Sequence, residues 1–134
     1  MQIQPPIAGN LEATGPAVIV LNKDLFFGVT IANTLRALGY SAIAARSTAA
    51  LSSALAIHPD AALVIVDISA ADDWDALQRT LAASPEVPSI AFGSHTNVDG
   101  LRAAKRAGLT RVFSNGEFHR TMGDTITRYA RQPI

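Results

Sequence analysis

The sequence contains no cysteine, which excludes disulfide bonds, thiolate catalysis and thiolate metal sites. Its 11 basic and 11 acidic residues cancel, so the chain lacks the excess positive charge with which proteins bind nucleic acids or anionic membranes nonspecifically. The longest apolar runs, such as 61–66, are far shorter than the ~20 residues that cross a bilayer. The first residues also lack the basic and apolar segments of a signal peptide. We therefore expect a cytoplasmic protein that binds neither nucleic acid nor membrane.

Motifs for several kinds of site are missing as well. No glycine-rich nucleotide loop follows a strand-like segment, and the 3 histidines lack metal-ligand spacing. Ser94, His95 and Asp67 suggest a hydrolase triad, but the Gly-x-Ser-x-Gly motif of such enzymes is not found. We expect no enzymatic activity and no cofactor, and we expect His95 to be a loop residue that makes ordinary hydrogen bonds.

What the chain does contain is enough apolar residues, 49% of 134, to bury the core of one domain. Residues 1–16 are rich in proline and glycine and predict a flexible leader. Residues 17–131 alternate between strand-like and helix-like segments, and residues 132–134 form a short tail.

Five short apolar segments predict strands that are buried on both faces. They cover residues 17–21, 41–45, 62–67, 88–92 and 111–114. The segments that follow them predict helices over about 24–38, from Ser47 or Thr48 to His58, over about 73–83, from Asn97 or Asp99 to Gly108, and over 118–131.

Strands that alternate with helices form a parallel sheet with right-handed crossovers. The predicted fold class is therefore α/β, a flavodoxin-like doubly wound sheet of five strands in the order 2-1-3-4-5 with five helices. Sites in such sheets form at the carboxyl ends of the strands. That edge gathers Asn22 and Lys23, Asp67, the 93–95 segment and Asn115.

Four segments in this order and spacing resemble the receiver domains of two-component response regulators, over residues 17–131. They are Val18-Ile19-Val20-Leu21, Leu35-x-x-Leu38-Gly39-Tyr40, Asp60-x-x-Leu63-Val64-Ile65-Val66-Asp67 and Ala103-Ala104-x-x-Ala107-Gly108. The resemblance implies that Asp67 stands at the position of the phosphoacceptor. It also implies that Mg²⁺ would be held by Asp67, by an acidic pair after the first strand and by the carbonyl of Ser69.

The chain departs from the receiver pattern at most of its functional positions. The acidic pair maps to Asn22 and Lys23, and a divalent ion at about 4 Å from Lys23 would meet up to ~8 kcal/mol of repulsion at an effective dielectric of about 20. Three other positions are altered, and each has lost the group that receivers carry there: Gly93 for the hydroxyl residue, Val112 for the aromatic switch residue, and Asn115 for the phosphate-pairing lysine. These changes indicate a degenerate receiver.

Three functions remain open. The first is a stand-alone degenerate receiver-like signalling module that needs no phosphorylation and acts through an unidentified protein partner, or as a homodimer through the face of the fourth helix, fifth strand and fifth helix. The second is a receiver phosphorylated on Asp67, with a weak Mg²⁺ site formed by Asn22, Asp24 and Ser69. The third is a small-ligand binder at the strand-end crevice, where Asp24, Ser69, Ser94 and His95 lie.

Two local hypotheses concern charge at this crevice. Lys23 either forms an ion pair with Asp67 in place of a metal or points into solvent. The carboxylates of Asp72, Asp73 and Asp75 either bind a cation or, as we favour, cap the third helix, whose dipole attracts negative charge.

The first helix carries an apolar stripe that we expect to face the core. Its members fall at spacings of three and four residues and are Leu25, Val29, Ala32, Leu35 and Leu38. Of the adjacent Phe26 and Phe27, one is expected in the core and the other at an exposed or paired surface.

Overall fold

The computed structural model describes residues 15–131. The predicted leader therefore lies outside the described residues except for Gly15 and Pro16, and so does the predicted tail. The strands are β1 Ala17–Leu21, β2 Ser41–Ala45, β3 Leu63–Asp67, β4 Ser89–Gly93 and β5 Arg111–Ser114. The α-helices are α2 Leu25–Ala37, α3 Thr48–Ile57, α4 Trp74–Ala82, α5 Val98–Arg106, α6 Asn115–Arg120 and α7 Met122–Tyr129, and a 3-10 turn, η1, covers Ile68–Ala70.

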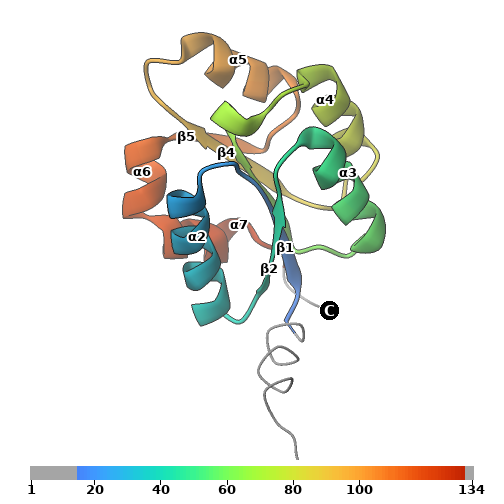
Figure 1. Ribbon diagram of the computed structural model, residues 1–134, viewed down its shortest axis with the longest axis vertical. Helices are drawn as coiled ribbons and strands as arrows, with labels where there is room; N and C mark the ends of the chain where they lie inside the picture. Colours follow the sequence, from blue (N-terminus) through green and yellow to red (C-terminus); the bar gives the residue numbers. More distant parts are fainter. Residues whose placement is uncertain (1–14, 132–134) are drawn as a thin grey trace, which may run out of the picture.

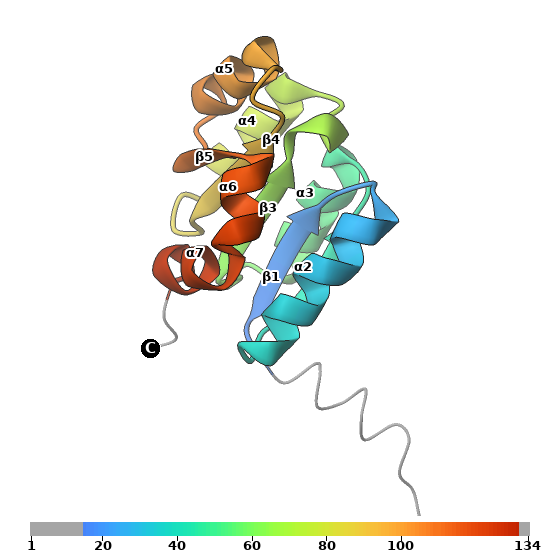
Figure 2. The same ribbon diagram turned by 90° about the vertical axis from the view of Figure 1, so that its left-hand side faces the viewer.

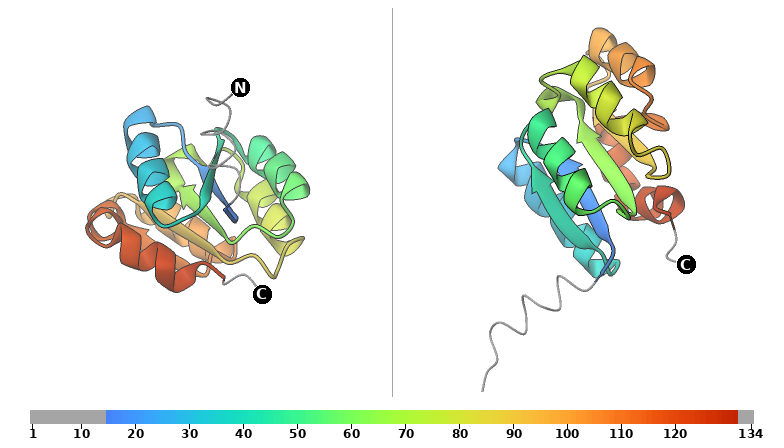
Figure 3. Two further views of the ribbon diagram at one scale, coloured as in Figure 1. Left: turned by 90° about the horizontal axis from the view of Figure 1, so that it is seen from below. Right: turned by 90° about the vertical axis from the view of Figure 1, so that its right-hand side faces the viewer.

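The five strands form one parallel sheet in the order β2-β1-β3-β4-β5, which confirms the predicted fold class. Helices α2, α6 and α7 cover one face of the sheet, while α3, α4 and α5 cover the other (Figures 1 and 3). The strands are buried on both faces because successive side chains point to opposite sides. Ile19 and Leu21 of β1 belong to the core under α3, α4 and α5, whereas Val18 and Val20 belong to the core under α2, α6 and α7.

Short polar side chains begin most of the helices, as their positions in the sequence predict. Asp24 caps α2, Ser47 caps α3, Asp73 caps α4 and Asn97 caps α5, each through a side-chain oxygen that accepts a backbone N–H. Helix α2 ends before Gly39, whose φ of 93° is a left-handed conformation that glycine adopts without strain.

The prediction of one closing helix over 118–131 is wrong. The chain forms α6 from Asn115 and then α7, and Figure 2 shows the two helices running in different directions. The break falls at Thr121, whose φ and ψ are −120° and 20°. The Thr121 hydroxyl donates to the carbonyl of Glu117 at 2.8 Å, and this bond back to the preceding turn competes with a continuous helix.

The predicted core stripe of α2 is also partly wrong. Leu35 is fully buried, but Leu25 is 77% exposed and Val29 60% exposed, and Leu38 lies on the surface too. Ile31 is buried instead, and Phe27 packs against the same core while Phe26 is exposed. Helix α2 has apolar residues on more than one side, so spacing alone did not identify the buried side.

Candidate functional site

Asp67 lies at the carboxyl edge of the sheet, between the ends of the two strands that flank β3. The register pairs Leu21 with Val66 and Phe92 with Asp67, so Asn22 and Gly93 follow on either side. The Asp67 side chain is 5% exposed. Its Oδ1 accepts hydrogen bonds from the Ser69 N–H at 3.0 Å and from the Ser69 hydroxyl at 2.7 Å. Asp67 therefore caps η1.

The residues after β1 form a small hydrogen-bonded turn. Asn22 Nδ2 donates to the carbonyl of Asp24 at 2.7 Å, and Asn22 Oδ1 accepts the N–H of Asp24 at 3.2 Å. Asp24 Oδ1 in turn accepts the N–H groups of Phe26 and Phe27 at 2.9 and 3.2 Å. The amide oxygen of Asn22 and one carboxylate oxygen of Asp24 are thus bound to backbone donors.

Lys23 is exposed, and within residues 15–131 no ion pair or hydrogen bond joins it to Asp67. The hypothesis of a Lys23–Asp67 ion pair is therefore wrong. The positive charge of Lys23 acts instead on Asp72, where it is the smallest of several influences that lower the pKa.

The acidic residues before α4 accept hydrogen bonds from groups in the first turns of helices. Asp72 Oδ1 accepts the hydroxyl of Thr48 at 2.7 Å and the N–H of Thr48 at 3.0 Å, which joins the loop after β3 to the first turn of α3. These bonds, the hydroxyl first, lower the pKa of Asp72 from its ordinary value. Asp73 Oδ1 accepts the N–H of Ala76 at 3.0 Å. The prediction that these carboxylates cap the third helix is confirmed for Asp73, whereas Asp72 supports α3.

The side chain of Ile68 fills the space beside Gly93. A Cβ atom built on Gly93 would lie 2.9 Å from Cδ1 of Ile68, and one on Gly100 would lie 2.7 Å from Cγ2 of the same residue. Ile68, which directly follows Asp67, is 4% exposed. Its side chain occupies the space between the end of β4 and the first turn of α5.

Ser94 and His95 do not form a catalytic arrangement with Asp67. The Ser94 hydroxyl bonds to that of Thr96 at 2.8 Å. His95 is exposed and makes no hydrogen bond with a described residue, contrary to our expectation. No arrangement of nucleophile and base is present at this edge of the described chain.

Val112 lies on β5, and Asn115 directly follows that strand. Val112 is half-buried and packs against the core under α3, α4 and α5. Asn115 is half-buried at the start of α6, whose first turn is capped by Ser114. Among the residues that the structure describes, no three acidic or histidine side chains are grouped to hold a metal ion.

An aromatic cluster under α2 and α6 was not predicted. The centroid of the His119 ring lies 4.4 Å from that of Phe27 and 5.8 Å from that of Phe92. The Phe92 ring in turn stacks on the Phe118 ring, with 4.6 Å between the centroids. His119 Nε2 is buried and has no hydrogen-bond partner within the described part of the chain. These residues come from three separate elements, and no local pattern brings them together.

No described helix is long and apolar enough to cross a membrane. Comparison with known proteins finds no matching family model and no matching curated protein. Solved structures do match. The receiver domain of NtrX from Brucella abortus aligns with a TM-score of 0.70 at 17% identity, over 83% of this chain and 95% of that one. Chemotaxis protein CheY4 from Vibrio cholerae gives 0.70 at 13% identity, over 87% and 99%.

A third structure, the beryllofluoride-activated NtrC4 receiver domain dimer, gives a TM-score of 0.66 at 16% identity, over 85% of this chain and 98% of that one. At such low identity the likeness shows the fold alone. The chain therefore has the fold of response-regulator receiver domains.

Proposed function

We propose that this chain is a signalling module of the receiver fold that acts through protein contacts and does not use Asp67 as a phosphoacceptor. The proposal rests on the hydrogen bonds that the carboxylates at the carboxyl edge of the sheet accept. Asp24, Asp67, Asp72 and Asp73 each accept backbone N–H groups at the start of a helix. In the same proposal the module is cytoplasmic and is not an enzyme.

The chemistry of phosphoryl transfer supports this reading. Mg²⁺ requires several hard oxygen ligands in near-octahedral geometry, and transfer to an aspartate depends on neutralising charge on the phosphoryl oxygens. Asn22 offers one neutral oxygen that already accepts the N–H of Asp24. Ile68 fills the space beside Gly93, and Asn115 carries no charge. Few groups remain that could stabilise the developing charge.

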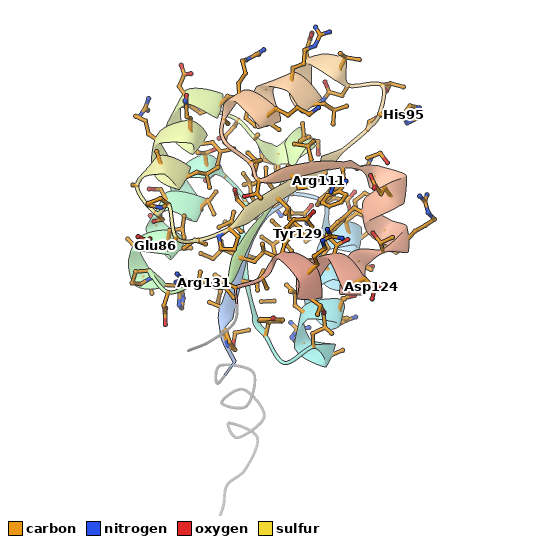
Figure 4. The ribbon with its side chains drawn as sticks, turned by 180° about the vertical axis from the view of Figure 1, so that it is seen from behind. Glu86, His95, Arg111, Asp124, Tyr129 and Arg131 are labelled. Atoms are coloured by element: carbon orange, nitrogen blue, oxygen red, sulfur yellow. The ribbon has the colours of Figure 1, made fainter. Side chains whose placement is uncertain are left out.

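The surface of α5, β5 and α7 is the candidate contact face. Arg102, Lys105 and Arg111 are exposed there. Arg111 donates to the Tyr129 hydroxyl at 2.9 Å, and Figure 4 shows the two side chains together on this face. An ordered Arg–Tyr pair suits an interface because such side chains combine apolar area with hydrogen-bonding groups. A partner protein or a second copy of the chain would bind here.

A phosphorylatable receiver is the second candidate. It is favoured by the place of Asp67 at the end of β3 and by its Oδ2, which makes no hydrogen bond with a described residue. Binding of a small ligand at this same crevice has less support, because Ser69 and Ser94 are engaged with near neighbours.

Incubation with acetyl phosphate and Mg²⁺, followed by intact mass measurement, separates the first two candidates. We expect no phosphoryl adduct on the wild-type chain. An adduct that disappears in the Asp67→Asn variant would establish the phosphorylatable receiver and contradict the proposal.

A further inference from the structure

A cavity of about 370 Å³ lies at the opposite, amino edge of the sheet, between the last turns of α4 and α5 and the start of β4. Figure 3 shows the two helices side by side on one face of the sheet. Its volume falls in the range of small-molecule pockets, roughly 300–1,000 Å³. No residue of the crevice around Asp67 lines it.

Ser89, the first residue of β4, is one of the residues that line this cavity. Ser89 is 3% exposed, and its Oγ makes no hydrogen bond with a described residue. The side chain points toward α4 and α5, because Ser89 alternates with Ile90 and shares its side of the sheet with Ala91. The Ser89 hydroxyl is not one of the enclosed polar atoms of the described chain that lack a partner, so it opens onto the cavity, where a ligand can reach it.

The other polar side chains of the cavity are also free. Arg106 in the last turn of α5, Gln78 of α4 and Thr110 before β5 make no side-chain hydrogen bond or ion pair within residues 15–131. No aspartate or glutamate lines the cavity. Asp75 lines a neighbouring hollow that shares Gln78 and Arg106 with the cavity. The cavity itself offers one cation and three neutral donor groups, which favours an anion.

The remaining wall is apolar. Leu81 and Val87 contribute aliphatic carbon, and Pro85 and Pro88 contribute rings without backbone N–H groups. A bare inorganic anion would leave this wall uncovered. We infer that the cavity binds a small organic carboxylate, with the carboxylate on Arg106 and Ser89 and the apolar body against Leu81 and Val87.

The helix dipoles make Arg106 essential to this binding. Helices α4 and α5 both end at the cavity, and the partial negative charge at their carboxyl ends opposes an anion. The guanidinium of Arg106 must outweigh that opposition, and its planar fork matches a carboxylate.

The test is a titration of the ¹⁵N-labelled protein with benzoate, with benzamide as a neutral control of the same shape. Benzoate should saturably shift the amides of Ser89, Gly108 and Thr110, and benzamide should bind about tenfold more weakly or worse. Equal binding of the two probes, benzoate shifts confined to other residues, or no benzoate binding in the millimolar range would overturn the inference.

Three variants assign the contacts. Arg106→Gln should weaken benzoate by about tenfold or more, whereas Arg79→Gln, in the last turn of the neighbouring helix α4 and outside the cavity, should leave it unchanged. Ser89→Ala should weaken benzoate severalfold without lowering the melting temperature, since its hydroxyl has no partner to lose. An unchanged affinity in Arg106→Gln would contradict the proposed carboxylate contact.

Two further probes identify the source of the carboxylate. Inorganic phosphate should bind more weakly than benzoate, and equal binding would remove the role of the apolar wall. A blocked tripeptide with one central glutamate should also bind more weakly. Tighter binding of that peptide than of benzoate would show that the cavity takes a protein side chain and would overturn the small-molecule assignment.

Discussion

The two edges of the sheet use their polar side chains in different ways. At the carboxyl edge, Asp24, Asp67 and Asp72 are bound to backbone N–H groups of neighbouring helices. At the amino edge, Ser89 and Arg106 have no partner among the described residues. The carboxyl edge is the usual place for a site in this kind of sheet, yet here its acidic groups stabilise the fold. The donor side chains without a partner among the described residues lie instead at the amino edge, where the topology of the sheet predicts no site.

The largest expected effect is on the packing that closes the carboxyl edge. Ile68→Ala should lower the free energy of unfolding by about 2–5 kcal/mol, because the side chain is buried and its removal leaves a cavity. Urea denaturation measures the change. Ile57→Ala is the matched control, since Ile57 is 72% exposed and should change stability by no more than about 0.5 kcal/mol. Equal losses in the two variants would contradict a packed edge.

Introducing a hydroxyl residue at position 93 should be the next most costly change. Gly93→Thr should destabilise the protein by about 1–3 kcal/mol, because its Cβ would collide with Ile68. Adding Ile68→Ala to that variant should make the two losses less than additive. Strictly additive losses in thermal or urea unfolding would mean that Ile68 does not occupy the space beside Gly93.

Substitutions of Asp67 test directly whether its carboxylate caps η1. Asp67→Ala should cost about 1 kcal/mol through loss of the cap on η1, and Asp67→Asn should cost less because the amide oxygen still accepts from Ser69. A variant series measured by chemical denaturation would decide this. A gain in stability in Asp67→Ala would indicate a strained functional carboxylate and not a cap.

The smallest expected effect is a change with pH in the stability that Asp72 contributes. Hydrogen bonds from Thr48 lower the pKa of this carboxyl in the folded state. The stabilisation is therefore complete above the ordinary pKa of the group and is lost as pH falls through the lowered value. The melting temperature of Asp72→Asn should lie slightly below that of the wild type near pH 7, and the gap should narrow in acid. A gap that widens in acid would contradict this sign.

Much of the fold follows from local sequence. Buried strands appear as short β-branched runs. Asp24 and Asp73 marked two helix starts, because short oxygen side chains satisfy free N–H groups. For the other two the sequence left Ser47 or Thr48 and Asn97 or Asp99 open, and the structure selects Ser47 and Asn97. The strand order was predicted from the flavodoxin-like arrangement that is common for strands alternating with helices, and the structure confirms it.

What could not be predicted depends on contacts between distant residues. Asp72 reaches Thr48 across 24 positions, and the fit of Ile68 against Gly93 and Gly100 requires the folded sheet. The break at Thr121 is marked by neither proline nor a charge pattern. The sequence also could not show that the Ser89 hydroxyl makes no hydrogen bond with a described residue, because this depends on which side chains surround it in the fold.

Titration with magnesium chloride tests the account most directly, with the backbone amides of Asn22, Asp67 and Ser69 as reporters. If the carboxylates of this edge serve the helix starts, these signals should stay in place into the millimolar range. Saturable shifts at the three residues that vanish in the Asp67→Asn variant would reveal a working metal site and contradict the account.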